Sequence, residues 1–189
     1  MSQGDAAYVD PTVRLYGDVT FAEGTSIWPN AVLRAESNFI RIGAFTNIQD
    51  FVMVHVGYTS PTVVGAYCSI THHATLHGCT IGDDCLIGIG ATVMDGADIE
   101  AGSVVVGHAF VREGTQVPPN SIVMGTPAKV VDTRDSFIGN RINAHLYHRN
   151  ALAYARGDHR AWTGPEYDTW FAGIEAEVAA ERARRAGGL

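Results

Sequence analysis

The sequence of 189 residues has little cysteine, little positive charge and no long apolar run, and each shortage excludes a class of protein. Its 3 cysteines, Cys68, Cys79 and Cys85, are odd in number and predict no disulfide framework. With 13 Lys and Arg against 20 Asp and Glu, the formal charge of −7 is a poor match for nucleic acid or an anionic membrane. No apolar run is long enough to span a bilayer, and the opening residues MSQGDAAYVD do not resemble a secretory signal. We therefore expect a cytoplasmic, reduced protein with no membrane or nucleic-acid partner.

Glycine, by contrast, is abundant, and its 21 residues recur after aliphatic positions in the first two thirds of the chain. A large aliphatic or aromatic residue returns every six positions, with three breaks in the spacing. The members of this series are Leu15, Phe21, Ile27, Leu33, Ile42, Ile48, Val54, Val64, Ile70, Leu76, Ile81, Ile87, Val93, Ile99, Val105, Val111, Val117 and Val123. Four positions after each member stands a small or β-branched residue, except for Tyr58 and Pro127. A repeat of this kind indicates a solenoid.

The six-residue period fits neither an α-helix nor a simple alternating strand. It predicts short strands joined by tight corners in a parallel β-helix, and so many matches of both positions disfavour the alternative, an ordinary β-sandwich. Resemblance to hexapeptide-repeat proteins implies three units per turn, hence about six three-sided coils, and left-handed winding. We expect an N-terminal segment over 1–12, the β-helix over 13–130 and a helical extension over 131–189. Within the extension, apolar spacing predicts helices over 132–156 and 166–185, packed alongside the prism.

Two histidines are predicted to stack on one face of this prism. His55 and His77 directly follow series members that lie three units apart, so they occupy equivalent places on successive coils, about 4.8 Å apart. Arg34 extends the same column. His72 lies two places after Ile70 on another face, with Asp50 stacked beneath it.

These three histidines cannot converge inside one solid prism, but they can meet where the face of one subunit contacts a neighbouring subunit. Repeating that contact three times closes a ring, so the sequence predicts a homotrimer with His55 and His77 from one chain and His72 from the next. Three imidazoles with an open position are typical of catalytic Zn²⁺, although imidazole also suits Fe²⁺, Co²⁺ or Ni²⁺. The other five histidines are expected to be solvated side chains.

Several stretches between residues 10 and 130 resemble the gamma-class carbonic anhydrase family. They are SIWPNAVLR (26–34), TNIQD (46–50), VHV (54–56), HHATLHGCTIGDDCLIG (72–88), GATVMDGA (90–97) and GTPAK (125–129). The resemblance implies that His55, His72 and His77 are metal ligands.

The same resemblance implies roles for further residues. Gln49 and Asn47 match residues that hydrogen-bond the metal-bound solvent or substrate, and Tyr147 matches a helix tyrosine near the metal. Arg34 and Asp50 match a charged pair that bridges subunits. The family usually has Asp where this chain has Glu36, and the loop after His55 lacks the acidic residue that shuttles protons in some members.

The activity that the resemblance implies is reversible hydration of CO2 to bicarbonate by metal-bound hydroxide at the trimer interface. Because of the two departures, other functions stay open. One is a weakly active or inactive homologue that acts as a metal-binding, ligand-binding or assembly scaffold. The others are a metal-dependent thioesterase and a hexapeptide acyltransferase-like enzyme.

Overall fold

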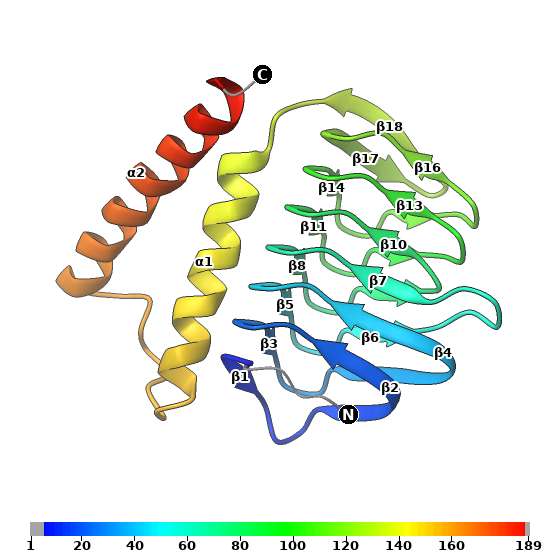
Figure 1. The fold of residues 1–189 in the computed structure, drawn as a ribbon, viewed down its shortest axis with the longest axis horizontal. Coiled ribbons are helices and arrows are strands. Elements are labelled where there is room, and N and C mark those ends of the chain that lie inside the picture. The colour runs from blue at the N-terminus through cyan, green and yellow to red at the C-terminus, as the bar shows by residue number, and fades with distance from the viewer. Residues whose placement is uncertain (1–5, 188–189) are drawn as a thin grey trace.

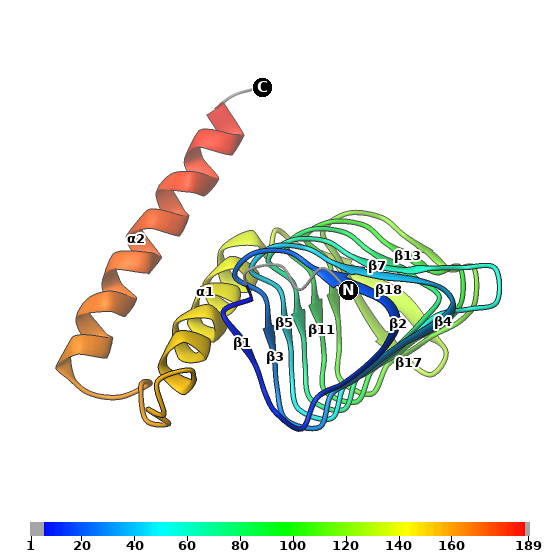
Figure 2. The same cartoon turned by 60° about the horizontal axis from the view of Figure 1, so that its bottom comes forward.

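The computed structural model, which describes residues 6–187, is a left-handed parallel β-solenoid of about six turns followed by two helices (Figure 1). The predicted β-helix is therefore confirmed. Figure 2 shows that the coils enclose one elongated interior and that both helices lie outside it. Among residues 6–187, no helix is long and apolar enough to cross a membrane.

Two sheets form the walls of the solenoid. An eight-stranded sheet makes one face and contains β1 (Tyr8–Val9), β3 (Ser26–Ile27), β5 (Asn47–Ile48), β8 (Ser69–Ile70), β11 (Leu86–Ile87), β14 (Val104–Val105), β17 (Ser121–Gly125) and β18 (Ala128–Thr133). A ten-stranded sheet forms the rest of the wall. Its strands are β2 (Arg14–Phe21), β4 (Val32–Ile42), β6 (Met53–His55), β7 (Thr62–Val64), β9 (Thr75–His77), β10 (Thr80–Ile81), β12 (Thr92–Val93), β13 (Asp98–Ile99), β15 (Phe110–Val111) and β16 (Gln116–Val117).

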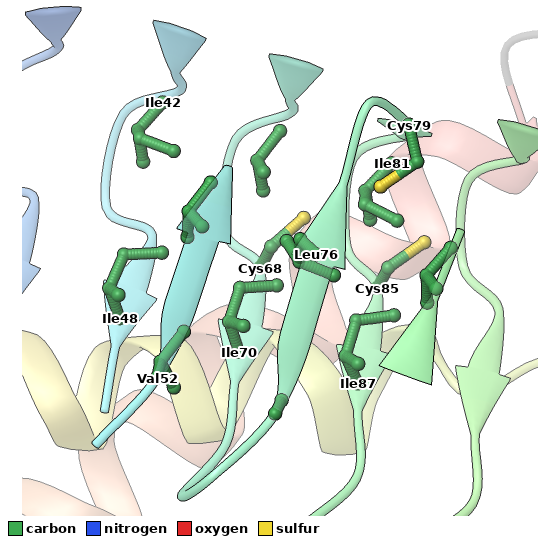
Figure 3. Close-up of a cluster of buried hydrophobic side chains, with 14 of the residues drawn as sticks. Ile42, Ile48, Val52, Cys68, Ile70, Leu76, Cys79, Ile81, Cys85 and Ile87 are labelled. Atoms are coloured by element: carbon green, nitrogen blue, oxygen red, sulfur yellow. The ribbon is translucent and has the colours of Figure 1, made fainter. Parts of the chain in front are cut away.

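The six-residue series fills the interior. Every member is buried except Leu15, which is partly buried against the same core. Strands of successive coils pair in parallel so that Ile48 lies beside Ile70 and Ile70 beside Ile87, as the stacked side chains of Figure 3 show. Small residues such as Cys68 fill the corners. Because the same kind of residue occupies the same position in successive coils, the repeat alone predicts the fold.

The first break in the spacing produces a long strand. The three extra residues between Leu33 and Ile42 let β4 run on around a corner, where it pairs with β2 through an irregularity between Gly17 and Asp18. Gly17 has φ +78, and a Cβ there would lie only 1.8 Å from the carbonyl oxygen of Ala35. Glycine is therefore required at this close approach of two backbones.

The helical extension begins later than its apolar spacing predicts. Helix α1 spans Phe137–Tyr154 rather than starting at residue 132, because β18 folds back on β17 as an antiparallel hairpin. Helix α2 spans Pro165–Gly187. Helix α1 contacts β1, β3, β5 and β8, and α2 packs on α1 through Phe137, Ile174 and Val178. Helix α1 thus covers the eight-stranded face.

A buried ion pair joins α1 to the solenoid. Arg141 Nε donates to Asp84 Oδ1 at 2.7 Å, and Nη2 donates to Oδ2 at 3.0 Å. Both side chains are buried, at 4% and 6% exposure. The Arg141 guanidinium also lies 3.5 Å from the centroid of the Tyr67 ring. This pair fixes the height of α1 against the coils.

Candidate metal centre

His55 and His77 end two neighbouring strands of the ten-stranded sheet. Strands β6 and β9 pair in parallel, with His55 directly beside His77. His55 Nδ1 lies 3.0 Å from His77 Nε2, and the ring centroids are 4.9 Å apart. Arg34 of β4 pairs with His55 on the other side. The predicted column is confirmed, because regular parallel pairing places the residue after each core aliphatic at the same point of the face.

His72 lies beyond the end of β8, on the eight-stranded face, as its spacing predicts. Its Nδ1 lies 3.1 Å from Asp50 Oδ2, which confirms the predicted stacking of these two residues. Within residues 6–187 of a single chain, no three His, Cys, Asp or Glu side chains are grouped so that they could hold a metal ion. One chain therefore brings His55 and His77 together, and it leaves His72 apart from them.

Each of the three imidazoles contacts a carboxylate of its own chain. Besides Asp50 on His72, Glu36 Oε2 lies 3.0 Å from His55 Nε2, and Asp95 Oδ2 lies 2.9 Å from His77 Nδ1. Carboxylates in these places orient imidazole rings and favour one tautomer.

Glu36 also bonds Arg34. Desolvation works against it, but hydrogen bonds from Arg34 and His55 keep the pKa of the Glu36 carboxyl below its usual value. Glu36, one methylene longer than the family's Asp, thus reaches the histidine pair directly. The predicted bridge between Arg34 and Asp50 of another subunit stays a prediction, since within one chain these residues pair with Glu36 and His72.

The donor set fits a transition-metal ion. Because Nδ1 of His77 is hydrogen-bonded to Asp95, its Nε2 keeps a lone pair that can bind a metal ion. This nitrogen faces His55 Nδ1 at 3.0 Å. Two nitrogens on one tetrahedral Zn²⁺ are separated by about 3.3 Å, given bonds of about 2.0–2.1 Å. The contact of Asp50 with His72 Nδ1 likewise leaves the Nε2 lone pair of His72 able to bind a metal ion. Imidazole donors suit Zn²⁺, Fe²⁺ and Co²⁺, so the geometry does not choose among them.

Asn47 and Gln49 lie together beneath α1. Asn47 Nδ2 donates to the carbonyl oxygen of Cys68 at 3.2 Å and to Ser69 Oγ at 3.0 Å. Its Oδ1 accepts from Gln49 Nε2 at 2.9 Å, and Asn143 of α1 donates to the same Ser69 oxygen at 2.8 Å. Both amides are buried, at 1% and 2% exposure. This chain of hydrogen bonds fixes the Gln49 amide, with its nitrogen used and its oxygen turned away from Asn47.

Tyr147 is held in an aromatic cluster on α1. Its ring packs edge-on against Trp28 and Trp162, with both pairs of centroids 5.6 Å apart. Burial, with smaller contributions from the negative charges of Asp50 and Tyr154, raises the pKa of Tyr147 to about 12. The phenol therefore keeps its proton at neutral pH and can act as a donor there.

Asp95 is the site residue that the sequence analysis did not single out. It stands two places after Val93, not directly after it, and so lies outside the histidine column. The only signal was its presence in the GATVMDGA stretch that carries the family resemblance.

Known proteins share much of this sequence, although no family model matches the chain. Gamma carbonic anhydrase 1, mitochondrial, of Arabidopsis thaliana is 39% identical over 159 residues, covering 79% of this chain and 57% of that protein. The chain therefore spans a little over half the length of this plant relative.

Two microbial relatives are matched over more of their length. A Methanocaldococcus jannaschii protein named "Probable carbonic anhydrase" is 43% identical over 117 residues, covering 62% of this chain and 74% of that protein. The carnitine operon protein CaiE of Escherichia coli is 38% identical over 143 residues, covering 75% and 73%.

A solved structure shares both the fold and part of the sequence. A hexapeptide transferase family protein from Anaplasma phagocytophilum superposes with a TM-score of 0.66 at 33% identity, covering 79% of this chain and 91% of that one. The microbial relatives are matched over more than two thirds of their length at well above 30% identity. The chain belongs to the gamma-class carbonic anhydrase family of hexapeptide-repeat proteins.

Proposed function

We propose that this protein is a metal-dependent carbonic anhydrase-like enzyme that reversibly hydrates CO2 to bicarbonate at the interfaces of a homotrimer. One observation carries the proposal: His55 Nδ1 and His77 Nε2 face each other at 3.0 Å while His72 lies on another face. A second subunit that placed its His72 against this pair would complete a three-imidazole site. The family relationship supports the same activity.

In this proposal His55, His72 and His77 hold the ion, Zn²⁺ with Fe²⁺ or Co²⁺ as alternatives. When bound, the ion supplies Lewis acidity that lowers the pKa of a water toward neutrality. Glu36, Asp50 and Asp95 orient the three rings from their own chains. Gln49, whose nitrogen is engaged by Asn47, offers its carbonyl oxygen as an acceptor that orients a reacting hydroxyl group. Tyr147, protonated at neutral pH, offers a donor for the carboxylate product.

The decisive test is stopped-flow hydration of CO2 by the full chain loaded with Zn²⁺ or Co²⁺. The matched control is His77→Ala, which removes one donor of the facing pair. We expect the loaded protein to hydrate CO2 well above the rate of this variant. Equal rates for the two proteins, measured with bound metal confirmed in the first, would reject the proposed activity.

Two departures from the family favour a second candidate, a metal-binding homologue with weak or no hydration activity. The loop after His55 contains no acidic residue to move protons, and Glu36 replaces the usual Asp. The relationship to CaiE and to a hexapeptide transferase family protein keeps thioester hydrolysis and acyl transfer among the alternatives. Stoichiometric metal without CO2 hydration would favour the scaffold. Metal-dependent cleavage of acyl thioesters would favour the hydrolase, and acyl transfer by metal-free protein the transferase.

The cytoplasmic location stays a prediction, since the plant relative is mitochondrial.

A further inference from the structure

The Asp95 carboxylate has one engaged oxygen and one that is buried without a partner. Its Oδ2 lies 2.9 Å from His77 Nδ1. Its Oδ1 is the one buried side-chain nitrogen or oxygen, among the residues described, that has no hydrogen-bond partner. A buried acceptor without a partner destabilises a folded chain, so its presence beside a histidine of the candidate metal centre requires a reason.

Two glycines leave the space that this oxygen occupies. A Cβ at Gly57 would lie 2.1 Å from Asp95 Oδ1, and a Cβ at Gly78 would lie 2.0 Å from it. Gly78 has φ +57, so its backbone also favours glycine. The φ angle of Gly57 lies outside the left-handed region, so the backbone conformation alone does not require glycine there. A Cβ there would nevertheless force the Asp95 carboxylate to move, and with it the contact to His77.

We propose that Asp95 is a positioning residue that holds His77 as a metal ligand. Its Oδ2 accepts a hydrogen bond from the Nδ1–H group, which fixes the tautomer that presents the Nε2 lone pair to the ion. A cation on Nε2 would also bring positive charge toward the unpaired oxygen, so the arrangement that is unfavourable in the metal-free chain is stabilised in the loaded one. This inference rests on the metal centre proposed above.

The test compares the full chain with Asp95→Asn, which keeps the size of the side chain and removes its charge. Both proteins are stripped of metal, and Zn²⁺ affinity is measured by competition with a chromogenic chelator. We expect the variant to bind Zn²⁺ about 10- to 100-fold more weakly. The Co²⁺-loaded variant should show an altered visible spectrum, since that spectrum reports ligand geometry. Thermal stability of the metal-free variant should be unchanged or higher.

Asp83→Asn is the matched control. Asp83 Oδ1 also lies against a glycine, 2.4 Å from where a Cβ of Gly65 would be, but it accepts from the Ala66 backbone nitrogen at 2.7 Å. Because asparagine keeps an oxygen that can accept this bond, Asp83→Asn should leave both thermal stability and Zn²⁺ affinity nearly unchanged.

A second variant separates the position of the carboxylate from its charge. Gly57→Ala keeps Asp95 but pushes its carboxylate aside, whereas Asp95→Ala removes the carboxylate. Both variants should weaken Zn²⁺ binding to the same extent. The double variant, Gly57→Ala with Asp95→Ala, should bind Zn²⁺ no more weakly than either single variant, because both changes act through the same contact.

The outcomes distinguish the two proposals. Wild-type protein that binds no Zn²⁺ overturns the metal centre, and the role of Asp95 falls with it. Wild-type binding with equal Zn²⁺ affinity in Asp95→Asn overturns only the role of Asp95. That role is also overturned if Asp95→Asn loses metal-free stability, which Asp83→Asn keeps, while the Co²⁺ spectrum stays unchanged.

Discussion

Mixing two inactive variants tests whether the site is shared between subunits. His72→Ala leaves the facing pair intact, and His77→Ala leaves His72 intact. In one chain the pair is 3.0 Å apart while His72 is bound to Asp50 on another face. Neither variant alone can form a three-imidazole site, whether the site lies within a chain or between chains.

The proposed trimer fixes how much activity a mixture recovers. Each site takes its pair from one subunit and its His72 from the next around the ring. In trimers assembled at random from equal amounts of the two variants, a site is intact when a His72→Ala chain supplies the pair and a His77→Ala chain supplies the third histidine. Two independent choices of one in two give intact ligands at about a quarter of the sites.

The assay is co-expression of the two variants with different tags, isolation of mixed trimers, and measurement of bound Zn²⁺ and CO2 hydration. Removing the unmixed trimers raises the expected share of intact sites to about a third, because each mixed trimer contains one such site among its three. The matched control mixes His55→Ala with His77→Ala. Both changes lie in the facing pair, so no arrangement of these chains gives an intact site, and recovery should be absent. Verified mixed trimers of the first kind with no more metal or activity than their parents would refute the shared site.

Three further predictions address stability. Arg141→Ala should lower the free energy of unfolding by about 3–5 kcal/mol in urea denaturation, because it removes both hydrogen bonds to the buried Asp84 carboxylate and leaves only Arg185 near it, at 3.8 Å. A loss below about 1 kcal/mol would contradict this. Because the pKa of Tyr147 is raised to about 12, the folded chain keeps a proton that the unfolded chain releases near pH 10, so stability should fall as pH rises from about 10 to 12. Tyr147→Phe should show a smaller fall in urea titrations at pH 9 and 11, and identical falls would count against the shift. Zn²⁺ at 100 times its Kd should stabilise the stripped protein by about 2.7 kcal/mol, and chelation should reverse this, whereas a Tm that ignores zinc would speak against a folded-state site.

The fold could be predicted from sequence because the signal is repetitive. Each coil contributes the same kind of core residue at the same spacing, so errors at single positions do not matter. The β18 hairpin and the start of α1 could not be predicted in this way. Residues Ala128–Thr133 pair with β17 outside the repeat, and that pairing is a tertiary contact with no periodic signature.

The site was predictable where it follows the coil register and unpredictable where it does not. His55 and His77 directly follow core aliphatics three units apart, and Asp50 and His72 are related in the same way. Asp95 reaches His77 from the next coil at a different place in the repeat, where Gly57 and Gly78 leave room for its carboxylate. Such a contact depends on local backbone shape, which the series of aliphatic residues does not encode.

In the proposed site, contacts within one chain orient the imidazole rings, whereas contacts between chains complete the set of ligands. Every candidate ligand is oriented by an acid of its own chain: His55 by Glu36, His72 by Asp50 and His77 by Asp95. In this arrangement the imidazole rings are oriented before the subunits associate, so association does not require these rings to rotate. In the proposed site the ligand set, by contrast, is incomplete in each chain, so a site of three imidazoles forms only on association. In the proposed trimer, bound metal favours the assembled state by the same coupling free energy with which assembly favours metal binding. A dilution series should accordingly show Zn²⁺ release and trimer dissociation at the same protein concentration, and metal retained by isolated monomers would contradict that linkage.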